Sequence, residues 1–90
     1  MSKKVIVIGA GLGGLATALR LSSKGYQVEV IEKYHQPGGR LNQLQKDGFT
    51  FDVGPSFFSM SYEFTELFKS CNIPNPLTLQ ELNPVYSVYF

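Results

Sequence analysis

The chain has 90 residues, a formal net charge of +1, and 43% hydrophobic and 13% aromatic residues. This composition excludes a disordered segment, and so small a charge offers no field that would argue for nucleic acid or an anionic membrane surface. A chain of this length buries only about 60% of its unfolded surface, so we expect one compact unit of marginal stability.

The N-terminal segment combines a strand pattern, a glycine-rich turn and a helix pattern. Residues 4–8 (KVIVI) are β-branched and apolar after Lys4, which predicts a strand covered on both faces. Residues 9–14 (GAGLGG) follow at once and fit the pattern GxGxxG. Apolar residues then recur at helical spacing from Leu12, and Gly25 stands where a left-handed helix cap is expected.

A second strand is predicted over residues 26–32 (YQVEVIE), which alternate and end in the acid Glu32. The sequence therefore predicts a β-α-β unit. The same N-terminus imitates a secretory signal, because residues 5–19 are uncharged and follow two lysines. A signal peptide needs none of the later elements, whereas a nucleotide-binding unit requires them, and the sequence favours the second interpretation. The uncharged run also falls short of the roughly 20 residues that span a bilayer.

Two further elements are predicted downstream. The segment RLNQLQKDGFTFDVG is typical of two short strands that turn at residues 46–48, with Phe49 and Phe51 on one face. Ser61 is a candidate N-cap for a second helix that ends before Pro74. The fold class that we predict is α/β: a Rossmann-like βαβ dinucleotide-binding unit with a short antiparallel hairpin and a second helix, forming a partial domain.

The C-terminal residues 76–90 are expected to be extended, and they end in the apolar run VYSVYF without a polar tail. We therefore expect residues 1–90 to be the N-terminal part of an FAD- or NAD(P)-binding domain, with the remainder of the enzyme absent. Such a fragment would leave sheet edges and apolar surface exposed, so self-association is expected. We expect no turnover from it alone.

The three glycines of the motif have separate physical tasks. Gly9 permits a tight turn out of the strand, Gly11 lets the backbone approach a pyrophosphate, and Gly14 allows close helix–strand packing. The following helix directs free N–H groups and its positive dipole end at the phosphates. Glu32 is positioned to accept hydrogen bonds from an adenosine ribose and to repel a 2′-phosphate.

A second glycine pair, Gly38 and Gly39, precedes Arg40 and again invites the backbone close to a ligand, with a cation beside it. A nicotinamide site has no need of this feature, so it favours a flavin. The alternative interpretation is an ordinary loop with a surface arginine.

The stretch from residue 5 to residue 58, which includes Glu32-x5-Gly-Gly-Arg and GGRLNQLQKDGFTFDVGPS, resembles the flavin amine oxidase and phytoene desaturase superfamily. Within it the sequence is most similar to the bacterial carotenoid desaturases. The resemblance implies that the dinucleotide is FAD. The residues that we assign to the cofactor are Gly9, Ala10, Gly11, Leu12, Gly13, Gly14, Glu32, Lys33, Gly39, Arg40, Leu41, Gly54, Pro55 and Ser56.

The family resemblance also implies the reaction. FAD would accept hydrogen from a carbon–carbon single bond of a hydrophobic polyene, a carotenoid precursor, in a full-length oxidoreductase at the membrane surface of a reducing cytoplasm. The lone Cys71 agrees with such a compartment. We assign no catalytic residue, no metal site and no nucleic-acid partner. Two alternatives are an amine-oxidising flavoprotein of the same superfamily and a non-catalytic binding protein on the same fold.

Overall fold

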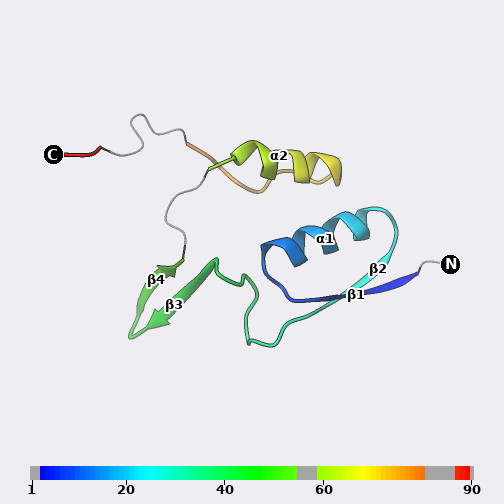
Figure 1. Ribbon diagram of the computed structural model, residues 1–90, viewed down its shortest axis with the longest axis horizontal. Helices are drawn as coiled ribbons and strands as arrows, with labels where there is room; N and C mark the ends of the chain where they lie inside the picture. The colour runs from blue at the N-terminus through cyan, green and yellow to red at the C-terminus, as the bar shows by residue number, and fades with distance from the viewer. Residues whose placement is uncertain (1–2, 55–58, 81–86, 90) are drawn as a thin grey trace.

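The computed structural model describes residues 3–54, 59–80 and 87–89. Its elements, in chain order, are β1 (Lys4–Ile8), α1 (Leu12–Ser23), β2 (Gln27–Ile31), β3 (Asn42–Lys46), β4 (Phe49–Val53) and α2 (Ser61–Ser70) (Figure 1). The predicted β-α-β unit, the hairpin and the second helix are confirmed. The fold is a partial Rossmann-like α/β arrangement.

The β-α-β unit pairs β1 with β2 in parallel, in a register that runs from Lys4 opposite Gln27 to Ile8 opposite Ile31. Helix α1 connects the strands and lies along one face of the pair (Figure 1). Alternate residues of both strands are half-buried and the others are exposed. The prediction that β1 is covered on both faces is wrong: Ile6 and Ile8 are 54% and 86% exposed, because α1 covers only one face.

Small residues let α1 approach the strands. Ala18 is its one buried residue within the described chain. The predicted apolar stripe does not face a single layer, since Ala16 lines a groove toward α2 whereas Leu15 lines a hollow beside β2. The helix ends in a Schellman motif: the Gly25 N–H donates to the Ser22 carbonyl and the Tyr26 N–H to the Leu21 carbonyl. Gly25 has a φ of 93°, which confirms its predicted left-handed cap.

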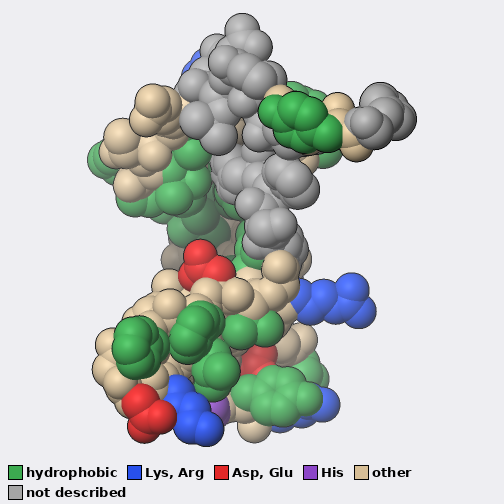
Figure 2. Space-filling model, turned by 90° about the vertical axis from the view of Figure 1, so that its left-hand side faces the viewer, with side chains coloured by type: hydrophobic (Ala, Val, Ile, Leu, Met, Phe, Trp, Pro, Cys, Tyr) green, Lys and Arg blue, Asp and Glu red, His purple; other side chains and the backbone are tan. Residues whose placement is uncertain are grey.

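Strands β3 and β4 form an antiparallel hairpin whose tight turn has positive φ at Asp47 (52°) and Gly48 (81°). A turn with two such residues matches the right-handed twist of the strands. The Phe49 and Phe51 rings lie on one face with centroids 6.4 Å apart, as predicted. Leu44, opposite Phe51, shares this face. These side chains are more than half exposed, and Figure 2 shows hydrophobic side chains at the surface of this end of the molecule.

Helix α2 begins one residue away from the prediction. Ser61 is the first helical residue and not the N-cap; the cap is Met60, which adopts the left-handed conformation with a φ of 57° and makes no side-chain capping bond. The reason is that Met60 has left-handed dihedral angles, which a right-handed helix cannot include, so the helix starts at Ser61. A second Schellman motif with Asn72 at positive φ closes the helix ahead of Pro74.

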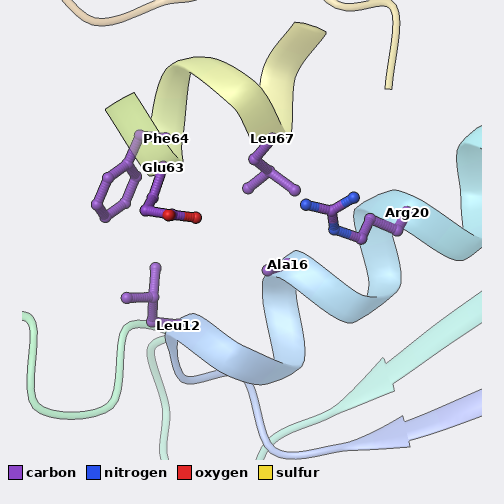
Figure 3. Close-up of a pocket in the computed structure, with 6 residues that line it drawn as sticks. All are labelled: Leu12, Ala16, Arg20, Glu63, Phe64 and Leu67. Atoms are coloured by element: carbon purple, nitrogen blue, oxygen red, sulfur yellow. The ribbon is translucent and has the colours of Figure 1, made fainter. Parts of the chain in front are cut away.

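The two helices pack side by side (Figure 1). An apolar groove between them is lined by Leu12, Ala16, Arg20, Glu63, Phe64 and Leu67, whose side chains converge from the two helices in Figure 3. At one end the Arg20 guanidinium donates a hydrogen bond of 3.1 Å to the Ser70 hydroxyl. Cys71, the C-cap of α2, is buried.

The chain is not the compact unit that its length suggested. Its radius of gyration is 16.5 Å, against about 12 Å expected for a compact domain of this size, and its extents are 61 × 33 × 24 Å. The physical reason is that the hairpin projects from the β-α-β unit (Figure 1), and among the described residues no helix or other strand packs on it. Residues 73–80 and 87–89 contain no helix or strand. No helix among the described residues is long and apolar enough to cross a membrane.

Candidate dinucleotide-binding site

The glycine-rich turn leads the chain from β1 directly into α1. Gly9 has a φ of 103°, and its N–H donates to the Ile31 carbonyl at 2.7 Å, which ties the turn to the end of β2. The N-cap is Gly11, and the first turn of the helix contains no acidic residue. The first N–H groups of a helix lack intrahelical partners. The end of α1 therefore offers backbone donors and a positive dipole end to a phosphate, and its own first turn contributes no carboxylate that would compete for them.

Gly14 is fixed by packing. A Cβ built on Gly14 would collide with the carbonyl oxygen of Gly9 and would lie 3.5 Å from the Val7 side chain. This confirms the predicted task of Gly14 in close helix–strand packing. Gly13 differs, because a Cβ there would meet no atom within 4 Å.

Glu32 follows β2 and turns its carboxylate back to the glycine turn. The Ala10 N–H donates to Oε1 at 2.9 Å and the Tyr34 N–H donates to Oε2 at 3.0 Å. The N–H donors of Tyr34 and then Ala10 lower the pKa of the Glu32 carboxyl below its ordinary value. Glu32 is therefore an ionised carboxylate at neutral pH that holds the glycine turn while keeping further lone pairs for a ligand.

A pH dependence of stability follows from Glu32. Because its folded-state pKa is lowered, its contribution to the free energy of unfolding is present above the unfolded-state pKa and is lost as the pH falls through the folded-state pKa. In the complete protein, the stability advantage of wild type over Glu32→Gln should shrink as the pH falls through and below the glutamate range. Denaturant titrations at a series of pH values measure it.

Glu29→Gln is the matched control for this experiment. Glu29 lies on β2, the strand that Glu32 follows, and its carboxylate makes an exposed ion pair with Lys4 at 3.1 Å. Exposed ion pairs contribute little to stability. The stability difference between wild type and Glu29→Gln should therefore depend much less on pH. Equal pH profiles for the Glu29 and Glu32 variants would contradict the role of Glu32.

The second glycine pair is in backbone contact with the first glycine turn. The Gly38 N–H donates to the Ala10 carbonyl at 2.7 Å. A Cβ built on Gly39 would lie 3.1 Å from the Gly11 Cα, and both Gly38 and Gly39 have positive φ. The structure thus brings together two glycine segments that are separated by more than twenty residues in the sequence.

Gly54 joins the hairpin to this loop. It follows β4 with a φ of 105°, and a Cβ built on it would collide with the Arg40 carbonyl oxygen. The side chains of Arg40 and Leu41 are exposed, and the Leu41 N–H closes a turn onto the Gly38 carbonyl. The predicted site residues Pro55 and Ser56 lie outside the described residues.

Lys33 is placed differently from the other predicted residues. Its Nζ atom lies 4.9 Å from the centroid of the Tyr34 ring, so the contact that the structure gives it is a cation–π interaction with its neighbour. This exposed pair lies beside Glu32 and makes no contact of its own with the glycine turn among the described residues.

A hollow beside Glu32 contains side chains that sequence reasoning did not select. It is lined by Ala10, Leu15, Val30, Glu32, Tyr34, His35, Gln36 and Pro37. Ala10 and Glu32 belong to the predicted site, whereas the other six lining residues were not assigned to it and are brought there by the fold beside Glu32. Within the described ranges, no group of three or more His, Cys, Asp or Glu residues is placed to hold a metal ion.

Comparisons with known proteins agree with this geometry. Residues 7–72 match the family model described as NAD(P)-binding Rossmann-like domain. The chain is 46% identical over 89 residues to 4,4'-diapophytoene desaturase (4,4'-diaponeurosporene-forming) of Staphylococcus aureus strain Newman, and matches that of strain MRSA252 equally. The alignment covers 97% of this chain and 18% of those relatives.

A solved structure, an oxidoreductase from Methanosarcina mazei, is also similar. It shares 49% sequence identity with a TM-score of 0.54, over 59% of this chain and 13% of that protein. The relatives therefore extend far beyond the aligned portion, and the aligned portion is the one that carries the glycine turn and Glu32. Because the family model spans well over half of the chain, the protein belongs to the NAD(P)-binding Rossmann-like domain family.

Proposed function

We propose that this chain forms the FAD-binding portion of a carotenoid desaturase-like oxidoreductase. The observation that carries the proposal is the 46% identity to 4,4'-diapophytoene desaturase over 97% of the chain. The geometry supports a dinucleotide site, because the glycine turn, Glu32 and the Gly-Gly-Arg loop lie in contact. The substrate class proposed from this identity is a hydrophobic polyene.

The residues fit an FAD nucleotide in two places. The turn over residues 9–14 and the N-terminus of α1 present backbone donors to a pyrophosphate, and Gly39 lies so close to this turn that a Cβ on it would come within 3.1 Å of the Gly11 Cα. The ionised Glu32 keeps acceptor lone pairs for ribose hydroxyls. An ionised carboxylate at this position also repels a 2′-phosphate, which disfavours NADP.

The chemistry then belongs to the cofactor and the positioning to the protein. Bound FAD supplies the acceptor for two hydrogens that leave adjacent carbons of the polyene as a new double bond forms. A hydrocarbon offers no acidic group for a side chain to deprotonate. The residues described above therefore bind and orient the nucleotide, and we assign no proton transfer to any of them.

Arg40 tests the flavin assignment. We propose that its exposed guanidinium pairs with the cofactor phosphates. Arginine suits this role because its side chain is always charged and its donors match the geometry of a phosphate. In the full-length protein, Arg40→Ala should weaken FAD binding by about tenfold, the loss of roughly one charge-assisted contact. Equilibrium titration of the apoprotein with FAD, followed by flavin fluorescence, measures the dissociation constant.

Arg20→Ala is the matched control, because Arg20 also lies on the βαβ unit but hydrogen-bonds to Ser70 on the α2 side. It should bind FAD as wild type does. A wild-type protein that binds NAD and not FAD would overturn the cofactor assignment. Equal affinities for Arg40→Ala and wild type would overturn the role of Arg40 alone.

We further propose that the full-length protein works at the membrane surface of the cytoplasm, since an apolar polyene partitions into bilayers. We also propose that the 90-residue chain self-associates. This association is supported by the exposed apolar face of the hairpin and by Ile6 and Ile8 on the outer face of β1.

A further inference from the structure

The loop that carries the Gly-Gly-Arg segment is closed by a side chain outside every motif. Asn42 is half-buried, whereas the other residues of β3 are exposed. Its Oδ1 accepts hydrogen bonds from the Gln36 Nε2 and from the Gln43 backbone N–H, the latter at 2.8 Å. Its Nδ2 donates to the Pro37 carbonyl at 3.4 Å. One amide thus ties the start of β3 back to the middle of the loop between β2 and β3.

A second bond closes the same loop. The Gln36 Nε2 also donates to the Gln43 carbonyl at 3.3 Å, so the Gln36 side chain reaches from the middle of the loop to the start of the hairpin. We call Gln36, Asn42 and Gln43 the loop clasp. The enclosed segment is the one whose Gly38 N–H donates to the Ala10 carbonyl and whose Gly39 packs against Gly11.

Gly38 lies inside the turn that the loop clasp closes. A Cβ built there would collide with the Leu41 carbonyl oxygen and would lie 3.6 Å from the Asn42 Nδ2. The turn is therefore folded tightly around residue 38, with the Asn42 amide as part of its wall. A tight turn of this kind fixes the position of the Gly39 backbone and of Arg40 relative to the glycine turn over residues 9–14.

We infer that Asn42 is a positioning residue of the nucleotide site, which holds the Gly-Gly-Arg loop against the glycine turn so that Gly39 and Arg40 meet the FAD phosphates. This inference rests on the proposed function. Asn42 itself touches no glycine of the first turn among the described residues and acts through residues 38–40. The acceptor Oδ1 carries most of the effect, because it takes the two shorter bonds.

The test uses the full-length protein and two readouts, the FAD dissociation constant and hydrogen exchange of the Gly38 amide. Asn42→Leu removes all three hydrogen bonds of this side chain and should raise the FAD dissociation constant about tenfold, mainly through the loss of the two shorter bonds to Oδ1. It should also speed exchange at Gly38. Asn42→Asp keeps the acceptor oxygens and should stay within about threefold of wild type.

Gln45→Leu is the control, because Gln45 lies on the opposite face of β3 and belongs to no clasp bond among the described residues. It should match wild type in both readouts. The inference is overturned if Asn42→Leu binds FAD within about twofold of wild type, whether or not Gly38 exchanges faster.

Failure of the proposed function gives a different result. A wild-type protein that binds no FAD overturns that function, and the same variants are then titrated with NAD. In that case an unchanged NAD dissociation constant and unchanged Gly38 exchange in Asn42→Leu overturn the positioning role as well. A weakened NAD affinity together with faster exchange supports that role for the nucleotide site itself.

Discussion

Gly14→Ala should destabilise the complete protein by about 1–3 kcal/mol, which is the usual range for forcing an extra carbon into a packed site. The added Cβ would occupy the position of the Gly9 carbonyl oxygen, which is backbone and cannot move without opening the turn. Because this turn also presents the backbone donors, FAD binding should weaken together with stability. Denaturant titration measures the first effect and flavin fluorescence the second.

Gly13→Ala is the matched control for stability. It lies next to Gly14 in the same helix, and a Cβ there meets no atom within 4 Å. Replacing an exposed helical glycine by alanine ordinarily stabilises a protein by about 0.5–1 kcal/mol. The two variants should therefore change the free energy of unfolding in opposite directions. If the two variants had the same free energy of unfolding, the close approach of Gly9 and Gly14 would not be what excludes a side chain at position 14.

Gly54→Ala should raise the FAD dissociation constant by at least about tenfold. The position combines a φ of 105° with a Cβ that would overlap the Arg40 carbonyl oxygen. An alanine side chain there would push the Gly-Gly-Arg loop away from the hairpin end, and with it Gly39 away from Gly11. Equilibrium titration of the full-length variant with FAD measures the effect.

Gly48→Ala separates backbone strain from the collision. Gly48 lies in the turn of the same hairpin with a φ of 81°, but a Cβ there meets no atom within 4 Å. This variant should lose about 1–2 kcal/mol of stability through its left-handed conformation and bind FAD as wild type does. Parallel losses of FAD affinity in both variants would contradict a specific role of Gly54.

The elements of the fold could be predicted because each has a local cause. Apolar runs of different period mark the strands and helices, and glycine or asparagine at positive φ ends or turns them, as at Gly25 and Gly48. Glu32 was also predictable, since its distance from the glycine motif is set by the length of one helix and one strand. The family resemblance added the assignment of the second loop.

What the sequence could not indicate depends on contacts between distant segments. Coverage of β1 on both faces was expected from its composition, but composition does not say which layer covers a face. Ser61 is one residue past the actual cap, because Met60 adopts a left-handed conformation that no local sequence signal marks. The loop clasp around Asn42 was missed because isolated amide residues form no recognisable pattern, and only the folded loop brings Gln36 and Asn42 together.

The most direct measurement is anaerobic incubation of the full-length, FAD-loaded protein with 4,4'-diapophytoene, the polyene in the name of the desaturase relative. We expect the visible absorbance of the oxidised flavin to bleach while the polyene absorbance moves to longer wavelength as its conjugation grows. A flavin that stays oxidised with the polyene but is bleached by a primary amine would contradict the desaturase assignment and favour an amine-oxidising flavoprotein.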